Sequence, residues 1–202
     1  PRRTTTVKTR VMAGGQQLLR VDQEITRDLD EADAKDLIDK VRELLDHHDI
    51  HVVLFQDYNK GNLSVPVIRE ILLEAVKRNI PTAVDPKFDN FWAFRHVTLF
   101  KPNLKEIRAQ LPDVRVDKDS LRRAAGEIRK KLENRYTLIT LGDQGLYYDN
   151  NGEYEILPTQ PRSIADVCGA GDTVISIVAL GLALGLDMGE TALLANLAGG
   201  QV

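Results

Sequence analysis

The chain contains Asp166-Val-Cys-Gly-Ala-Gly-Asp-Thr173, which opens directly into the apolar stretch Val174-Ile-Ser-Ile-Val-Ala-Leu180. Glycines 169 and 171 let the backbone turn tightly and bring bare N–H groups close to an anion. The apolar residues predict a buried helix, whose N-terminus adds unpaired N–H groups and the positive end of its dipole. A carboxylate at Asp172 would repel that anion unless it removes a proton from a hydroxyl while a phosphoryl group arrives. The stretch therefore indicates a phosphate-binding turn with its own base, as in a kinase.

The same residues also fit a plain helix start. Gly-x-Gly before a helix is common, and an acidic residue in the first turn is stabilised by the helix dipole. Taken by themselves, these residues give the two interpretations about equal weight.

Composition favours one domain over residues 1–202. The 202 residues, 43% of them hydrophobic, can bury one sizeable core. With 27 basic and 30 acidic residues the net charge is −3, which leaves no basic surface for nucleic acid or anionic lipid. A single cysteine indicates a reducing compartment, the cytoplasm. The longest apolar segment, residues 174–186, is too short to span a membrane.

Strand-like and helix-like segments alternate along the chain. A β-hairpin is expected over residues 4–22, and a second one over residues 146–157 with Asn151-Gly152 as its turn. Other strands are expected at residues 50–55, 82–85, 97–100 and 136–141, and helices at 31–46, 64–78, 104–111, 120–133 and twice after residue 170. This alternation predicts an α/β fold, a mostly parallel sheet flanked by helices on both faces.

Ligands of such sheets bind at the carboxyl ends of the strands. The polar residues that immediately follow predicted strands are Asp57, Asp85, Lys101, Asn103 and Gly142. We therefore expect these residues to gather along one edge of the sheet.

The two ends of the sequence are unusual. Residue 1 is proline, and the apolar helix near Val202 has no obvious capping residue. We expect the chain to be a fragment of a larger domain, incomplete at both ends and catalytically weak by itself.

A second motif, Lys101-Pro-Asn-Leu-Lys-Glu106, leaves a predicted strand and starts a helix. Asn103 and Glu106 are three residues apart and share one helical face, so both can meet one ligand. Mg²⁺ takes one or two carboxylates and keeps several waters, which suits Glu106. The alternative is a capping box, which these residues alone favour by about two to one.

Asp-Val-Cys-Gly-Ala-Gly-Asp-Thr resembles the C-terminal signature of the PfkB, or ribokinase-like, carbohydrate kinases, which reads Asp-Thr-x-Gly-Ala-Gly-Asp. Val167 stands here where that pattern has threonine. The resemblance implies that Asp172 is the catalytic base and that the amides of Gly169, Ala170 and Gly171 hold the transferred phosphate. It also implies a ribokinase-like fold in which residues 4–22 form a lid-type hairpin.

The other motifs resemble the nucleotide site of the same family. Its Asn-x-x-Glu motif organises Mg²⁺ and the ATP phosphates, which implies Asn103 and Glu106 as metal ligands. The segment Thr140-Leu-Gly-Asp-Gln-Gly145 resembles one that lies against the phosphates. The residues that the resemblance assigns to the cofactors ATP and Mg²⁺ are Lys101, Asn103, Leu104, Lys105, Glu106, Thr140, Gly142, Gly145 and Asn196.

Asp57-Tyr-Asn-Lys-Gly61, Val84-Asp-Pro-Lys87 and the hairpin sequence resemble the heptose-phosphate kinase branch of the family. This implies transfer of phosphate from ATP to the anomeric hydroxyl of heptose 7-phosphate, on the path to ADP-heptose for lipopolysaccharide. The residues expected at the sugar phosphate are Asp57, Lys60, Lys87, Lys8 and Arg10.

Two alternatives stay open. One is a kinase of the same family that acts on another sugar, a nucleoside or a vitamin alcohol, and the other is a non-catalytic nucleotide-binding or assembly module. Expected partners are the small-molecule sugar phosphate, a second copy bound through the hairpin lid, and a fused or separate nucleotidyltransferase. Neither nucleic acid nor a membrane is an expected partner.

Overall fold

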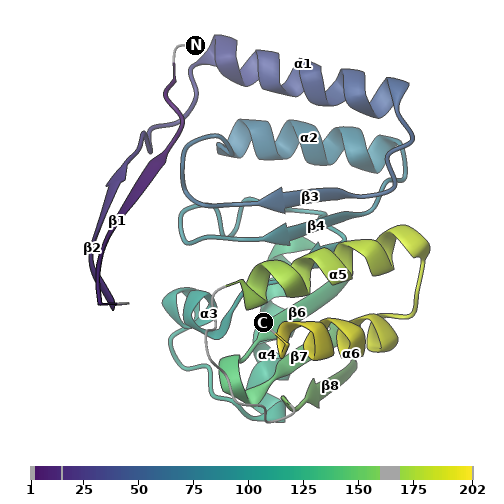
Figure 1. The fold of residues 1–202 in the computed structure, drawn as a ribbon. Coiled ribbons are helices and arrows are strands. Elements are labelled where there is room, and N and C mark those ends of the chain that lie inside the picture. Colours follow the sequence, from purple (N-terminus) through teal and green to yellow (C-terminus); the bar gives the residue numbers. More distant parts are fainter. Residues whose placement is uncertain (1–2, 15, 160–168, 202) are drawn as a thin grey trace.

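The structure is a computed structural model that describes residues 3–14, 16–159 and 169–201. It forms a six-stranded sheet flanked by helices, with a separate two-stranded hairpin at one side (Figure 1). Asp166, Val167 and Cys168 of the predicted phosphate-binding turn lie outside the described residues, as does Gly15 of the first hairpin.

The sheet follows the order of the sequence from one edge to the other. Its strands are β3 (Val53–Gln56), β4 (Thr82–Asp85), β5 (Leu99–Phe100), β6 (Tyr136–Thr140), β7 (Leu146–Asn150) and β8 (Glu153–Leu157). The pairings from β3 to β6 are parallel, whereas β7 and β8 are added antiparallel. The turn residues Asn151 and Gly152 both have positive φ, 51° and 104°, as a two-residue hairpin turn requires. The predicted sheet is confirmed as a mixed sheet whose first four strands are parallel.

Helices cover both faces of the sheet. Their bounds are α1 (Glu31–His47), α2 (Val65–Lys77), α3 (Leu104–Gln110), α4 (Lys118–Leu132), α5 (Ala170–Leu184) and α6 (Met188–Gly199), with a short 3₁₀ turn at Gly142–Gln144. Alternate residues of each strand point to opposite faces. Val84 and Phe100 therefore pack with α2, α3 and α4, whereas Ala83 and Leu99 pack with α5 and α6.

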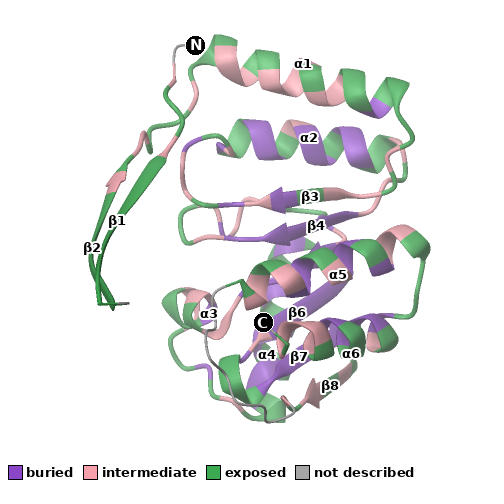
Figure 2. Ribbon diagram, viewed as in Figure 1, coloured by how far each residue is buried: buried purple, intermediate pink, exposed green. Residues whose placement is uncertain are grey.

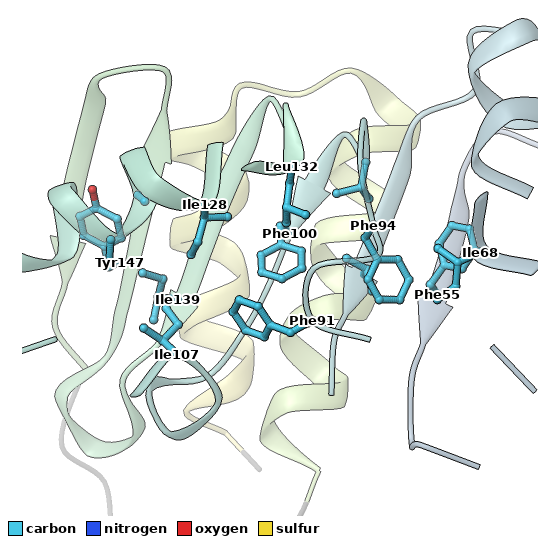
Figure 3. Packing of buried hydrophobic residues seen from close by; sticks show 14 of the residues in the cluster. Phe55, Ile68, Phe91, Phe94, Phe100, Ile107, Ile128, Leu132, Ile139 and Tyr147 are labelled. Atoms are coloured by element: carbon cyan, nitrogen blue, oxygen red, sulfur yellow. The ribbon is translucent and has the colours of Figure 1, made fainter. Parts of the chain in front are cut away.

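Aromatic side chains pack among aliphatic ones in the first of these two cores (Figure 3). Phe91 meets Phe100 edge-to-face with ring centroids 5.0 Å apart, and Phe55 meets Phe94 in the same way at 5.7 Å. Edge-to-face contacts of this kind add to the burial of the rings. They fix the carboxyl ends of β3 and β5, where the polar residues of the predicted site begin.

The hairpin of β1 (Val7–Ala13) and β2 (Gln16–Gln23) stands apart from the sheet and is exposed along nearly its whole length (Figure 2). It is anchored at its base, where Lys60 pairs with Glu24 and the backbone N–H of Leu29 donates to Gly61 O at 3.0 Å. A Cβ on Gly61 would lie 1.9 Å from Arg27 O, so only glycine allows this crossing. The loop that follows β3 thus holds the hairpin beside the sheet.

Among the residues that the structure describes, every helix is too short or too polar to cross a bilayer.

Candidate functional site

The first turn of α5 meets the carboxyl end of β3. Asp172 lies in that turn with an exposed side chain, and Gln56 Nε2 donates a hydrogen bond to its Oδ1 at 2.9 Å. The Tyr58 hydroxyl lies 3.5 Å from the same oxygen. The structure therefore brings together two segments that are 116 residues apart in sequence.

The backbone before Asp172 has the form of an anion-binding helix start. Gly169 is the N-cap of α5 with φ 98°, a conformation that favours glycine, and no side chain of the described residues caps the helix there. The amides of the first turn have no acceptor within the helix, and the dipole adds partial positive charge beside them. This geometry agrees with the predicted phosphate-binding turn of Gly169, Ala170 and Gly171.

A buried ion pair lies next to this turn. Lys101 follows β5, its side chain is only 2% exposed, and its Nζ lies 3.0 Å from Asp85 Oδ2 at the end of β4. A Cβ on Gly171 would lie 3.8 Å from the same ammonium, which places the ammonium next to this turn. The Lys101 ammonium thus lies next to both Asp85 and the predicted phosphate-binding turn at the start of α5.

Lys87 connects the carboxylate of Glu106 to the ion pair of Lys101 and Asp85. Its Nζ lies 2.5 Å from Glu106 Oε1 and 3.7 Å from Asp85 Oδ1. Burial by itself lowers the pKa of Lys87, but the hydrogen bond to Glu106 and the charges of Asp85 and Glu106 outweigh it, so the pKa is raised. Lys87 therefore stays an ammonium at neutral pH.

Asn103 and Glu106 form the capping box that the residues alone favour. Asn103 Oδ1 accepts from Glu106 N at 2.8 Å, and Glu106 Oε2 accepts from Asn103 N at 2.9 Å. The cap fixes both side chains at the start of α3, next to Lys87. The capping box gives both residues a structural role, and the remaining lone pairs of their side-chain oxygens can still bind a ligand.

The oxygens at this edge suit Mg²⁺. Glu106 offers a carboxylate, and Asp85 Oδ1 is buried with no hydrogen-bond partner among the described residues. The described part of the chain contains no group of three or more metal-binding side chains. Mg²⁺ needs only one or two carboxylates when phosphates and waters supply the other ligands, so the donor set fits the ion.

A cavity of about 700 Å³ opens beside the phosphate-binding turn. It is formed by the start of α3, the connection from β6 to β7, the start of α5 and the end of α6. The lining includes these predicted nucleotide residues: Asn103, Leu104, Lys105, Thr140, Gly142, Gly145 and Asn196. Lys101 and Glu106 are not in the lining; Lys101 lies at the turn described above, and Glu106 is tied to Asn103.

Backbone pairing and backbone conformation place Thr140 and Gly145 at the cavity. An isolated parallel bridge pairs Asn103 with Thr140, which joins the two predicted nucleotide motifs. Gly145 has φ 101°, and a Cβ there would lie 2.0 Å from Leu157 O. The volume of the cavity is typical of a small-molecule site.

Comparison with known proteins identifies the architecture. Residues 75–202 match the description "pfkB family carbohydrate kinase", which covers more than half of the chain. The chain belongs to the pfkB family of carbohydrate kinases. The predicted family is thus confirmed.

Curated relatives match the chain over its whole length. The chain is 38% identical over all of its length to "Bifunctional protein HldE" of Syntrophotalea carbinolica, and 39% identical over 99% of its length to the protein of that name from Trichlorobacter lovleyi. It spans about two fifths of each, 41% and 40%.

Two solved structures show the same fold. Escherichia coli phosphofructokinase-2 in complex with potassium superposes with a TM-score of 0.79 at 22% identity, over 96% of this chain and 62% of that one. Arabidopsis thaliana ribokinase complexed with ribose and ATP gives 0.70 at 18% identity, over 98% and 62%. The ribokinase-like fold predicted from the sequence is therefore confirmed.

The residues predicted to bind the sugar phosphate do not form a single cluster in this pfkB-family chain. Lys87 belongs to the charged group, and Lys8 Nζ lies 5.8 Å from the centre of the Tyr58 ring, while Arg10 is exposed on the same face of the hairpin. Asp57 is buried, where it accepts from Asn59 N at 2.8 Å and Asn90 Nδ2 at 3.1 Å.

Lys60 is held by its ion pair with Glu24 at the base of the hairpin. Asp57 and Lys60 would have to exchange their present partners to reach a ligand. Their contact with substrate stays a prediction. In the structure Asp57 fixes the loop that follows β3, and Lys60 ties that loop to the base of the hairpin.

Two residues near the site, Gln56 and Arg108, were missing from the predicted set, and Asp85 was expected at this edge of the sheet without an assigned role. Gln56 contacts Asp172, Asp85 pairs with Lys101, and Arg108 lines the cavity. Asp85 had a signal in the sequence, since it follows a strand directly and stands in the Asp-Pro-Lys motif. Gln56 directly follows the strand predicted at 50–55 and carried the same signal, although its contact with Asp172 depends on a segment 116 residues away. Arg108 carried none, because its place depends on the path of the α3 helix.

Proposed function

We propose that the protein transfers the γ-phosphate of ATP to a hydroxyl of a sugar phosphate, with D-glycero-β-D-manno-heptose 7-phosphate as the acceptor and the 1,7-bisphosphate as product. The observation that carries this proposal is the position of the Asp172 carboxylate. It lies in the first turn of α5, directly after the anion-binding backbone and beside a cavity of nucleotide size. A base at the same helix start that receives the phosphoryl group suits phosphoryl transfer.

In this mechanism Asp172 accepts the proton of the attacking hydroxyl. The amides of Gly169, Ala170 and Gly171, with the dipole of α5, stabilise charge on the transferred phosphoryl group. Lys101, held by Asp85, adds an ammonium beside the same turn. Asn103 and Glu106 would hold Mg²⁺, which would neutralise charge on the ATP phosphates when bound.

The acceptor assignment rests on the hairpin side of the site and on the relatives. Lys8 of β1 lies near Tyr58, and Lys87, which follows β4, lies near Asp85. Arg10, exposed on β1, adds a third cation for an anionic sugar. The motifs of the heptose-phosphate kinase branch are present, and the relatives called "Bifunctional protein HldE" match the chain over its whole length. These features favour a phosphosugar over a neutral sugar, nucleoside or vitamin alcohol.

The test is ADP release from the complete protein with Mg-ATP and a panel of acceptors. Heptose 7-phosphate should give the highest kcat/KM, above fructose 6-phosphate, ribose and adenosine. A preference for ribose or adenosine would replace the acceptor and keep the kinase. ATP binding without turnover on any acceptor would instead support a non-catalytic nucleotide-binding module.

Asn103→Ser separates the capping role from the proposed Mg²⁺ role. Serine and asparagine are equally good N-caps, so the free energy of unfolding should change by less than about 0.5 kcal/mol. The shorter hydroxyl does not reach as far, and the Mg²⁺ concentration for half-maximal activity should rise several-fold. Mg²⁺ titrations of activity and urea unfolding of both proteins measure the two effects. An unchanged Mg²⁺ requirement would leave Asn103 with a capping role alone.

We also propose a homodimer through the hairpin lid. Cross-strand pairing puts Val7, Val11, Leu19 and Val21 on one face of the hairpin, opposite the face of Lys8, and each of the four is 44–55% exposed. An exposed apolar face of this kind suits a protein interface. Val11→Lys should weaken the dimer at least tenfold in sedimentation experiments, whereas Gln17→Lys on the same hairpin should not. Equal dimerisation of both variants would rule this interface out.

Two further assignments complete the proposal. The relatives are called bifunctional, and we propose that a nucleotidyltransferase, fused or separate, uses the product. We place the reaction in the cytoplasm, where ATP is available and the single cysteine stays reduced. Detection of nucleotidyl transfer to the bisphosphate product after removal of one phosphate, and fractionation of cells, test the two assignments.

A further inference from the structure

We infer that Gln56 is a positioning residue for the catalytic base, an inference that rests on the proposed kinase function. Gln56 is the last residue of β3, and its side-chain amide lies between Asp172 of α5 and Asp85 of β4. It is the polar link between the base and the ion pair that holds Lys101.

The chemistry of the neighbours fixes the orientation of this amide. Nε2 lies 2.9 Å from Asp172 Oδ1, 3.5 Å from Asp85 Oδ2 and 3.4 Å from the Tyr58 hydroxyl. Ionised carboxylates only accept hydrogen bonds, so the NH₂ end of Gln56 must face them and the carbonyl end cannot. The shortest of the three contacts is the one to the base.

Strand pairing fixes the backbone of Gln56. It is paired in register with Asp85 across the parallel strands β3 and β4, and its neighbour Phe55 is buried in the aromatic core. Asp172, by contrast, is exposed in the first turn of a helix, where a short side chain can take more than one rotamer. The rigid strand therefore orients the more mobile carboxylate.

The contact also gives the two carboxylate oxygens of Asp172 different roles. Oδ1 of Asp172 receives the hydrogen bond from Gln56, whereas Oδ2 has no donor among the described residues. Holding Oδ1 directs Oδ2 toward the position of an incoming hydroxyl. A charge-assisted hydrogen bond of this kind fixes geometry as well as adding energy.

Removal of the donor should therefore lower kcat without weakening nucleotide binding. Gln56→Glu keeps the shape of the side chain but cannot donate when ionised, and Gln56→Leu removes the polar group altogether. Both should lower kcat about 10- to 100-fold. KM for ATP should stay within about twofold, because Gln56 is not part of the cavity lining.

A double-mutant cycle distinguishes positioning from a structural role. If Gln56 acts through the base, Gln56→Leu should have almost no further effect on residual turnover in an Asp172→Asn background. Gln110→Leu is the matched control, because Gln110 also uses its side-chain amide to bond two neighbours, Trp92 Nε1 at 2.8 Å and Phe88 O at 3.3 Å, away from Asp172. That control should lower the melting temperature at least as much as Gln56→Leu and leave kcat nearly unchanged.

The experiment uses the complete protein with Mg-ATP and heptose 7-phosphate, and follows ADP release and thermal unfolding. Turnover by the wild type with unchanged kcat in both Gln56 variants would overturn this inference and leave the proposed function standing. The same fold loss in the wild-type and Asp172→Asn backgrounds would also overturn it, since it would show action independent of the base. Absence of wild-type turnover on every phosphosugar is a different result, which would overturn the proposed function and the inference with it.

Discussion

Asp172→Asn should reduce turnover on the phosphosugar by about three orders of magnitude or more while ATP still binds. Asparagine has the shape of aspartate but cannot take up the proton that the attacking hydroxyl must lose. General base catalysis contributes about 10²- to 10⁴-fold, and the phosphate-binding amides that remain do not replace it. The measurement is ADP release under saturating substrates, with ATP affinity determined separately by calorimetry.

The matched control for this change is Asp119→Asn. Asp119 is also an exposed acidic residue in the first turn of a helix, α4, so its substitution removes the same favourable interaction with a helix dipole. It should leave kcat unchanged and alter stability by less than about 1 kcal/mol. If Asp172→Asn behaved like this control, Asp172 would be an ordinary first-turn carboxylate and the kinase mechanism proposed above would be wrong.

The helices and buried strands were predictable because their periodicity is local. The strand predicted at 82–85 was found at those residues, and the helix predicted at 31–46 is α1, Glu31–His47. The ends of strands were predicted less accurately where they depend on pairing with a neighbouring strand. The strand predicted at 50–55 begins only at Val53, because its neighbour β4 first offers a pairing residue at Thr82. Likewise β5 is shortened to Leu99–Phe100, which are the residues that pair with both neighbours.

The site was predictable where its residues act through backbone turns or helix starts. Glycines, a helix N-terminus and residues after strands leave a signal in the sequence, which is why the helix start at Gly169 and most of the cavity lining were predicted. Contacts between side chains of distant segments leave no such signal. Lys60 illustrates the limit, because the resemblance to the heptose-phosphate kinase branch suggested a sugar-phosphate site there, whereas its pairing with Glu24 depends on where the hairpin returns.

Lys101→Met should show the second large effect, on both stability and turnover. The Lys101 side chain is 2% exposed and that of Asp85 is 7% exposed, so loss of the ammonium leaves a buried carboxylate with weaker partners. Breaking a buried pair costs about 3–5 kcal/mol, and Lys87, at 3.7 Å from the other oxygen, should reduce this to about 2–4 kcal/mol. Urea unfolding measures this loss. If the ammonium also meets the transferred phosphate, kcat should fall about 100-fold or more.

The double variant Lys101→Met/Asp85→Asn separates the two effects. Neutralising Asp85 removes the unpaired buried charge, so most of the lost stability should return, because replacing both partners of a buried pair is far less costly than removing one. Turnover should stay low, since no cation has been restored beside Gly171. Lys118→Met, at an exposed lysine that begins α4, is the control and should change neither quantity. Recovery of turnover together with stability would mean that Lys101 only neutralises Asp85, and the phosphate would then depend on the amides of α5 and on Mg²⁺.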